Sequence, residues 1–228
     1  LSSYDVVILG EASLTQEQAA IYSDWVNSGG HLIAMRPDPD LAGLLGLTPV
    51  GTSLSEGYLL VNTAAAPGAG IVAETIQYHS SADQYTLVSG TTAVAMLYSN
   101  ATTPTTYPAV TTRSVGTQGG KASAFTYDLA KSVIYTRQGN PAWAGINGDG
   151  NAGPVRADDM FHNGVDPDWV NLDKVAIPQA DEQQRLLANL ILDMNEDKMP
   201  LPRFWYFPRG EKAVVLLTGD DHASGNVA

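Results

Sequence analysis

Two carboxylates and an imidazole stand side by side near the end of the chain, at Asp220-Asp221-His222. They follow an apolar run, Ala213–Leu217, whose unbroken hydrophobic character predicts a buried β-strand. Open α/β sheets bind their ligands outside the carboxyl ends of the strands. These three side chains are therefore candidate active-site residues, and we expect the groups that would complete such a site to lie beyond Ala228.

A second group of candidates lies in segment 138–175, which is rich in Gly, Asn, Asp and Pro and reads as a long loop. A loop of this length in a compact domain usually has a function or is an insertion. Trp143, Arg156, His162 and Trp169 form a candidate ligand cleft, because aromatic faces and planar polar groups suit carbohydrate. The alternative is that the tryptophans are buried and anchor the loop.

Two further patterns in the same loop point less clearly to chemistry. Gly148–Gly153 has the spacing G-x-G-x-x-G, but a dinucleotide site needs a strand before it and a helix after it, and Pro154 follows here. Several aspartates of the loop carry the oxygen ligands that Ca²⁺ prefers, without the spacing of an EF-hand. We interpret them as a solvated acidic loop, with a Ca²⁺ site as the alternative.

The composition excludes several classes of chemistry. The chain has 228 residues, no Cys and a net charge of −12. Without Cys there is no disulfide, no thiolate metal site and no Cys nucleophile. The acidity, with no cluster of Lys or Arg, argues against nucleic-acid binding. No apolar run reaches the length of a membrane span, and the chain has room for one large domain or two small ones.

The elements that would position these residues begin with a strand–helix–strand unit over residues 5–35. Val6–Leu9 is the first expected strand, and Ser13 to Gln16 has the pattern of a capping box that opens a helix. Gly29-Gly30 ends this helix, and Leu32–Met35 is the next strand. A crossover of this length predicts two parallel strands with a right-handed connection.

The rest of the chain predicts a short helix over 40–47, a strand-rich middle and one long helix over 181–195. The middle region, 50–136, is rich in Thr, Ser, Gly and Tyr and favours antiparallel strands or an extra sheet. Its expected strands cover residues 58–61, 86–88, 93–98, 109–113 and 121–127, with a hairpin turn at 116–120. The linker 197–210 carries three prolines and the aromatic run Phe204–Phe207, which marks a domain boundary.

The N-terminal unit resembles the class I glutamine amidotransferase-like fold, through Tyr4–Leu9 and Gly29–Ile33. More narrowly, it resembles the non-catalytic versions in trehalose-utilisation-type proteins and in the trimerisation domain of some β-galactosidases. Pro108–Val110 and Gly119–Lys121 fit the same pattern of strand, hairpin and strand. The resemblance covers residues 1–195 and implies a flavodoxin-like three-layer sandwich with a parallel sheet core and an additional antiparallel region.

The same resemblance argues against catalysis. Active members use a Cys on a strand-to-helix elbow, with His and Glu as partners, and this chain has no Cys. It also has no G-x-S-x-G pattern that would put a Ser in that place. The family fold starts with a strand and a helix upstream of Tyr4, so we expect the chain to begin inside a domain.

Leu217–His222 is similar to the opening motif of NodB-type polysaccharide deacetylases, a strand that ends in T-F-D-D-G. The resemblance implies that Asp220 is the catalytic base and that Asp221, with His222, binds a divalent metal such as Zn²⁺. A bound metal lowers the pKa of its water while a nearby carboxylate takes the proton. Gly219 replaces the usual aromatic residue, and the H-x-x-x-H metal motif of that family is not in this sequence.

Together these observations predict an amidotransferase-like α/β domain over residues 1–196, a linker over 197–210 and the first strand of another domain over 211–228. We expect a non-catalytic accessory or binding module of a larger, bacterial, carbohydrate-active protein, with no cofactor of its own. One alternative is that it is part of a metal-dependent hydrolase; another is an oligomerisation domain that forms homo-oligomers. The compartment stays open, with a secreted or periplasmic location favoured.

Overall fold

The computed structural model describes residues 1–148, 153–162 and 168–196, together with Val215. Asp220, Asp221 and His222 lie outside the described residues, as do the expected linker 197–210 and all but one residue of the segment 211–228. The structure therefore leaves the sequence-based interpretation of that end of the chain as a prediction.

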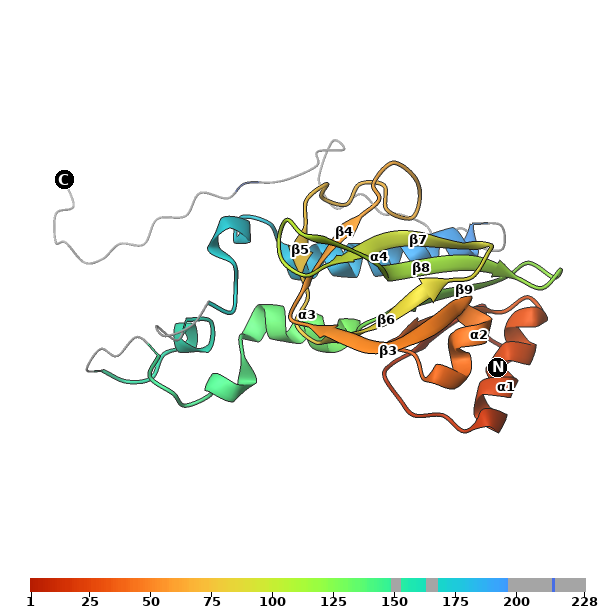
Figure 1. Ribbon diagram of the computed structural model, residues 1–228, viewed down its shortest axis with the longest axis horizontal. Coiled ribbons are helices and arrows are strands. Elements are labelled where there is room, and N and C mark those ends of the chain that lie inside the picture. The colour runs from red at the N-terminus through yellow and green to blue at the C-terminus, as the bar shows by residue number, and fades with distance from the viewer. Residues whose placement is uncertain (149–152, 163–167, 197–214, 216–228) are drawn as a thin grey trace.

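A seven-stranded sheet forms the centre of the fold, in the order β1-β2-β9-β8-β7-β4-β5. A separate two-stranded ribbon consists of β3 and β6 (Figure 1). The strands are β1 (Val6–Leu9), β2 (His31–Met35), β3 (Leu47–Ser55), β4 (Tyr58–Val61), β5 (Ile76–Gln77), β6 (Ser81–Leu87), β7 (Thr91–Tyr98), β8 (Pro104–Val115) and β9 (Gly120–Phe125). The α-helices are α1 (Gln16–Asn27), α2 (Ala42–Leu45), α3 (Leu129–Gln138) and α4 (Gln179–Asn195), and short 3₁₀ helices cover Pro39–Leu41, Pro141–Trp143, Ala157–Met160 and Leu172–Lys174.

The strand–helix–strand unit confirms the parallel pairing expected at the N-terminus, since β1 and β2 are parallel neighbours. The helix begins two residues later than the sequence pattern suggested. Thr15 is its N-cap, and the capping box joins Thr15 to Gln18 instead of Ser13 to Gln16. At the other end Gly29 has φ of 100°, a left-handed conformation that a residue with a Cβ adopts at a cost.

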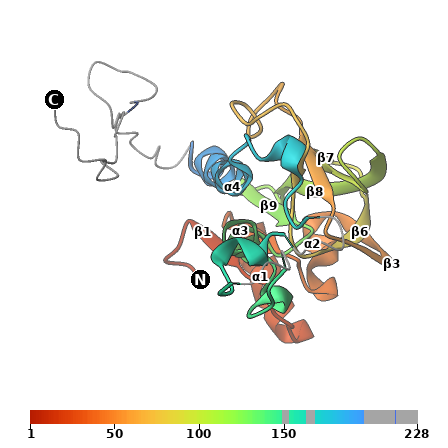
Figure 2. The ribbon, with the colours of Figure 1, turned by 90° about the vertical axis from the view of Figure 1, so that its left-hand side faces the viewer.

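The parallel part of the sheet is smaller than the resemblance implied. Among the described strands, the pairs β1–β2 and β2–β9 are parallel, whereas β9–β8, β8–β7, β7–β4 and β4–β5 are antiparallel. The α/β class and the antiparallel region are confirmed, but the sheet is curled and mostly antiparallel (Figure 2), without a flavodoxin-like parallel core. Part of the reason is local: short turns join β7 to β8 and β8 to β9, and such turns can join only antiparallel neighbours.

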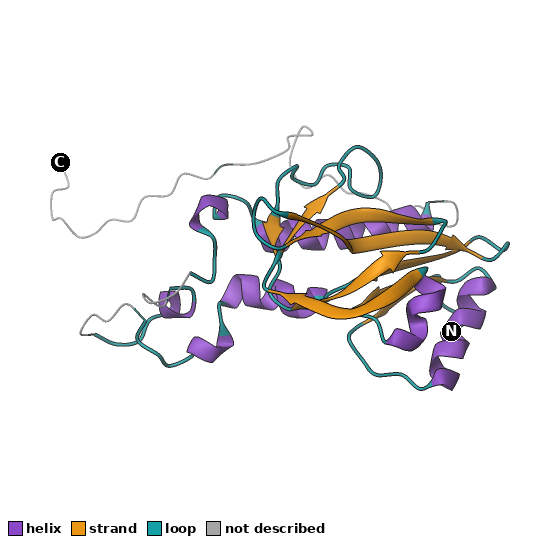
Figure 3. Ribbon diagram, viewed as in Figure 1, coloured by secondary structure: helices purple, strands orange, loops and turns teal. Residues whose placement is uncertain are grey.

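Helices cover both faces of the parallel strands (Figure 3). Strand β2 is buried throughout, and its side chains alternate between two cores. Leu32 and Ala34 face the core that includes α1 and α2, whereas Ile33 and Met35 face the core that includes α3 and α4. The apolar stripe expected on the last helix is confirmed, because Leu186, Leu190 and Met194 are fully buried.

Helix α3 was not expected from the sequence. It begins after Asp128, whose carboxylate accepts a hydrogen bond from the Lys131 backbone N–H at 3.0 Å. Helix α3 packs against α4, and the described parts of segment 139–178 lie at one end of the sheet (Figure 1). In the part of the chain that the structure describes, no helix has both the length and the apolar character of a membrane span.

Candidate functional site

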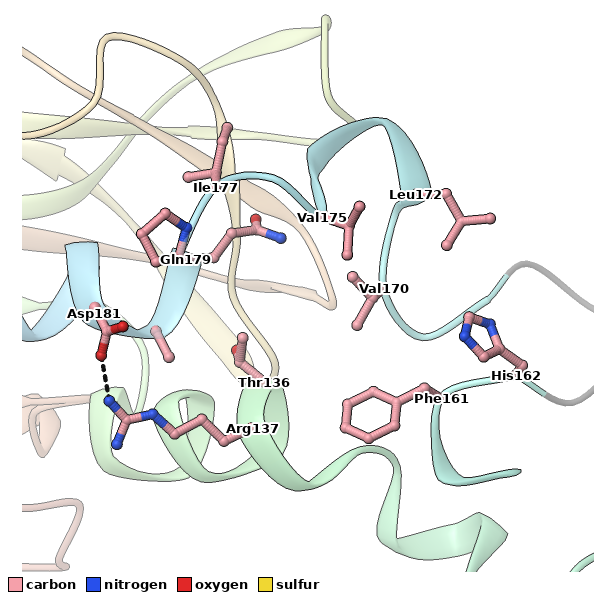
Figure 4. A pocket seen from close by; sticks show the side chains of 12 residues that line it. Thr136, Arg137, Phe161, His162, Val170, Leu172, Val175, Ile177, Gln179 and Asp181 are labelled. Carbon is pink, nitrogen blue, oxygen red and sulfur yellow. Dashed lines mark hydrogen bonds and ion pairs between the residues drawn. The ribbon is translucent and has the colours of Figure 1, made fainter. Parts of the chain in front are cut away.

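A cavity of about 350 Å³ lies between the C-terminal end of α3, the N-terminal end of α4 and the described parts of segment 139–178 (Figure 4). We call it the α3–α4 cleft. One aromatic and several aliphatic side chains form most of its lining: Phe161, Val170, Leu172, Val175, Ile177, Pro178 and Ala180. The polar lining comes from Thr136, Arg137, His162, Gln179 and Asp181. A cavity of this size, mostly apolar with a few polar groups, is typical of small-ligand sites.

An ion pair joins the two helices at the edge of the cleft. The Arg137 guanidinium donates to the Asp181 carboxylate, as the dashed line in Figure 4 marks, and to the Gln184 amide oxygen at 2.7 Å. Both charged side chains are about half exposed, at 49% for Arg137 and 58% for Asp181. An exposed ion pair contributes little to stability. Its charged and hydrogen-bonding groups are therefore available to a ligand at little cost to the fold.

His162 lies at the opposite end of the cleft in Figure 4, next to Phe161. Its Nδ1 is 3.2 Å from a carboxylate oxygen of Asp168. The Trp169 backbone N–H donates to the Phe161 carbonyl at 2.8 Å, which holds the two segments that carry these residues side by side. Of the four candidates for a ligand cleft, His162 is the one that lines this cavity.

The two tryptophans meet beside the cleft instead of lining it. The Trp169 indole N–H donates to the Tyr135 carbonyl at 2.9 Å, and its ring stacks on His79 with centroids 4.2 Å apart. Trp143 meets the Trp169 ring edge-on at 6.1 Å. This geometry anchors Trp143 and Trp169 to α3 and to the turn between β5 and β6. Arg156 is exposed, and its backbone N–H binds the Asp159 carboxylate at 2.7 Å.

The structure adds an acidic partner for His79 that the sequence did not indicate. Glu56 lies 2.7 Å from the His79 Nδ1, and the two residues are 23 positions apart in the chain. The Glu56 backbone has φ of 52°, which is uncommon for a residue other than glycine. Strand pairing between β4 and β5 brings these residues together, and no local motif signals such a pairing.

A buried hydrogen-bond network holds two walls of the cleft in place. Gln179 and Gln183, both on α4, bind the Gln77 backbone: the Gln179 side-chain oxygen accepts from its N–H at 2.5 Å, and the Gln183 amide donates to its carbonyl at 3.0 Å. The Gln77 side chain in turn binds the backbone of Trp169 and Asn171. The network fixes the start of α4 and segment 169–171 relative to the sheet, so the walls of the cleft are preorganised.

No cluster of three His, Asp or Glu side chains that could hold a metal ion occurs among the described residues. Asp220, Asp221 and His222 lie outside that part of the chain. The structure therefore does not test their assignment as a catalytic base and metal ligands.

No family model matches the chain, and no curated protein matches it either. Solved structures match parts of the fold. A β-galactosidase from Bacillus circulans sp. alkalophilus matches with a TM-score of 0.45 at 12% identity, over 58% of this chain and 22% of that chain. The exo-β-1,4-mannosidase Op5Man5 from Opitutaceae bacterium strain TAV5 matches with a TM-score of 0.45 at 14% identity, over 60% of this chain and 23% of that chain.

The mmIFT52 N-terminal domain matches more of the chain, with a TM-score of 0.46 at 14% identity over 88% of this chain and 81% of that chain. The protein spans only about a fifth of the galactosidase and mannosidase chains, between 21% and 23% of their length. These identities and TM-scores are too low to assign a function.

Proposed function

We propose that this domain is a non-catalytic binding module of a carbohydrate-active protein and that a sugar binds in the α3–α4 cleft. The observation that carries the proposal is the lining of the cleft. Phe161 and the aliphatic side chains offer an apolar wall, and Arg137, Asp181 and His162 lie at its edges (Figure 4).

This arrangement matches the two kinds of surface that a sugar ring presents. The C–H groups on the face of a pyranose are apolar and pack on aromatic and aliphatic carbon, which removes apolar surface from water. The hydroxyl groups around its edge donate to carboxylates and accept from a guanidinium, and hydrogen bonds to charged groups are stronger than neutral ones. Arg137 and Asp181 supply one group of each kind, next to the apolar wall.

The sequence favours a binding role over catalysis. Active members of the amidotransferase family that the chain resembles use a Cys nucleophile, and this chain has no Cys. The proposal concerns residues 1–196. A metal-dependent deacetylase centre that includes Asp220, Asp221 and His222 is the alternative for the end of the chain, and it can coexist with a binding role for the domain.

The test is calorimetric titration of the full chain with cellobiose, lactose, mannobiose and N,N′-diacetylchitobiose. Phe161→Ala removes the aromatic wall, and we expect it to weaken binding at least about tenfold. Tyr4→Ala is the matched control, since Tyr4 is an aromatic residue that is 64% exposed and lies outside the cleft. Equal affinities of the two variants, or no binding of any sugar to the unaltered chain, would contradict the proposal.

A second measurement separates binding from catalysis. Incubation of the chain with acetylated chito-oligosaccharides and Zn²⁺ is expected to release no acetate. Release that disappears in Asp220→Asn would refute the non-catalytic assignment and support the deacetylase alternative.

A further inference from the structure

A larger cavity, of about 520 Å³, lies where the ribbon of β3 and β6 approaches the segment that follows β2. We call it the ribbon cavity. Asp83, Gln84 and Tyr85 of β6, Thr52 and Ser53 of β3, and Pro39 are among its lining residues. None of them lines the α3–α4 cleft, so the two cavities share no residue.

A bulge in β3 contributes to the opening of this cavity. Pro49 pairs with Tyr85 and Ser53 with Asp83, so β3 advances four residues while β6 advances two. Gly51, within the bulge, has φ of 83°, and a Cβ there would meet no atom within 4 Å. The glycine is therefore required by backbone conformation and not by packing. Bulges occur preferentially next to functional sites, where they redirect side chains.

A second unusual backbone conformation lies beside the cavity, at the end of β2. Arg36 has φ of 41°, in the left-handed region that residues with a Cβ rarely occupy. Its Nε and Nη2 each donate to a different carboxylate oxygen of Asp83 at 3.2 Å, and Nη1 donates to Glu11 at 2.8 Å. A strained non-glycine residue persists only where its surroundings hold it, and such residues cluster at ligand sites.

The position agrees with the general topology of ligand binding. Glu11 follows β1 and Arg36 follows β2, so both stand at the carboxyl ends of parallel strands. Open α/β sheets bind ligands at this edge. The Arg36 guanidinium therefore links the carboxyl edge of the sheet to Asp83, which lines the ribbon cavity.

The charges around the cavity select the kind of ligand. The Arg36 guanidinium forms ion pairs with the carboxylates of Glu11 and Asp83. These three side chains together carry a net charge of −1, which repels anions. Both Asp83 oxygens already accept from Arg36, which leaves them poorly placed to chelate a cation. Each oxygen keeps a second lone pair that can accept from a hydroxyl group. A neutral molecule with several hydroxyl groups fits these conditions.

The other lining residues fit the same ligand. Thr52 and Gln84 are hydrogen-bonded to each other at 2.5 Å across the ribbon, and both are groups that exchange hydrogen bonds with hydroxyls. Pro39 is exposed and adds apolar surface next to them, whereas Tyr85 belongs to the core beneath the cavity. Tyr85 is 2% exposed, and its hydroxyl donates to the Pro37 carbonyl at 3.4 Å.

We propose that the ribbon cavity is a second ligand site, distinct from the α3–α4 cleft, and that it takes a neutral polyhydroxylated ligand of the sugar class. Asp83 and Gln84 hydrogen-bond the ligand hydroxyls. The Arg36 guanidinium donates to both oxygens of the Asp83 carboxylate and so fixes its orientation. The proposal stands on its own cavity and does not require a ligand in the α3–α4 cleft.

The test uses two-dimensional NMR of the ¹⁵N-labelled full chain with cellobiose, lactose and N,N′-diacetylchitobiose as probes. We expect one of these sugars to shift the amide signals of Ser53 and Gln84. Gln84→Ala is expected to weaken that binding at least about tenfold, since it removes two hydrogen-bonding groups from the wall. Thr86→Ala, an exposed position on the same strand outside the cavity, is the matched control and should bind as the unaltered chain does.

The outcomes separate this proposal from the proposed function. Shifts at Ser53 and Gln84 that Gln84→Ala abolishes and Phe161→Ala leaves intact support the ribbon cavity, whatever the α3–α4 cleft does. Sugar binding that Phe161→Ala abolishes and Gln84→Ala leaves intact supports the α3–α4 cleft alone and overturns the ribbon cavity. The absence of any shift at Ser53 and Gln84 with all three sugars also overturns it.

Discussion

Replacing Gln183 by Ala is expected to be among the most destabilising single changes in the domain. Gln183 is fully buried on α4, and its amide oxygen accepts from the Tyr127 hydroxyl at 3.1 Å and from the Ser132 hydroxyl at 2.9 Å. Its amide nitrogen donates to the Gln77 carbonyl at 3.0 Å. Four segments of the fold therefore meet at one side chain.

The size of the effect follows from what the change leaves behind. Gln183→Ala leaves the Tyr127 hydroxyl, the Ser132 hydroxyl and the Gln77 carbonyl buried without this hydrogen-bond partner. Each such loss costs about 1 to 3 kcal/mol. Relaxation around the site and water in the new space lower the sum, so we expect a loss of roughly 3 to 6 kcal/mol. A domain of this size has a free energy of unfolding of about 5 to 15 kcal/mol, and the variant loses a large part of it.

Urea denaturation, followed by far-ultraviolet circular dichroism, measures the free energy of unfolding of each variant. Gln184→Ala is the matched control: Gln184 is the exposed neighbour, its side-chain oxygen accepts from Arg137, and its loss should cost no more than about 0.5 kcal/mol. In the Gln183→Ala background, Tyr127→Phe removes a hydroxyl that no longer has Gln183 as its partner. It should therefore lower the free energy of unfolding less there than it does in the unaltered chain. A loss below about 1 kcal/mol for Gln183→Ala would refute the reasoning.

Two further predictions concern pH and the anchor of segment 139–178. Burial, with a smaller effect of the Asp83 charge, raises the pKa of Tyr85 to about 12 from 10.0. The unfolded phenol then loses its proton first, so this contribution is present below pH 10 and is lost as the pH rises toward 12. Burial also raises the pKa of Tyr78 and of Tyr127, which add losses of the same sign. Between pH 8 and 11.5, urea unfolding should therefore show the stability of the unaltered chain falling by about 2 kcal/mol more than that of Tyr85→Phe, and equal falls would contradict the prediction. Trp169→Ala removes the ring that stacks on His79 and the bond to Tyr135, so limited proteolysis should cut between α3 and α4 faster, whereas Tyr4→Ala should leave the rate unchanged.

The strand–helix–strand unit could be read from the sequence because its signals are local. Val6–Leu9 is an apolar run of strand length, Gly29-Gly30 stops the helix, and the connection length dictates parallel pairing. Helix α4 was equally clear from its stripe of Leu and Met. Helix α3 was missed because Ile134, Val133 and Thr136 are β-branched and lower the helical signal, although Asp128 was an N-cap that could have revealed it.

The arrangement of the sites was harder to predict because it depends on contacts between distant segments. His162 could be suspected from its loop, but the cleft it lines also requires α3 and α4 to pack together. Glu56 and Arg36 carry no sequence signal at all, since their roles come from left-handed backbone conformations and from partners 23 and 47 positions away. Such pairings are set by the topology of the sheet and not by local pattern.

The edge position of β1 has a practical consequence for handling the protein. Within the described residues β1 pairs with β2 on one side only, and its four residues contain neither a charge nor a proline. Native edge strands usually carry such features, which discourage pairing between molecules. Ile8, at 45% exposure, is the site where a lysine would introduce this protection with the least loss of packing. Preparations of Ile8→Lys should stay free of aggregates at concentrations at which the unaltered protein begins to form them.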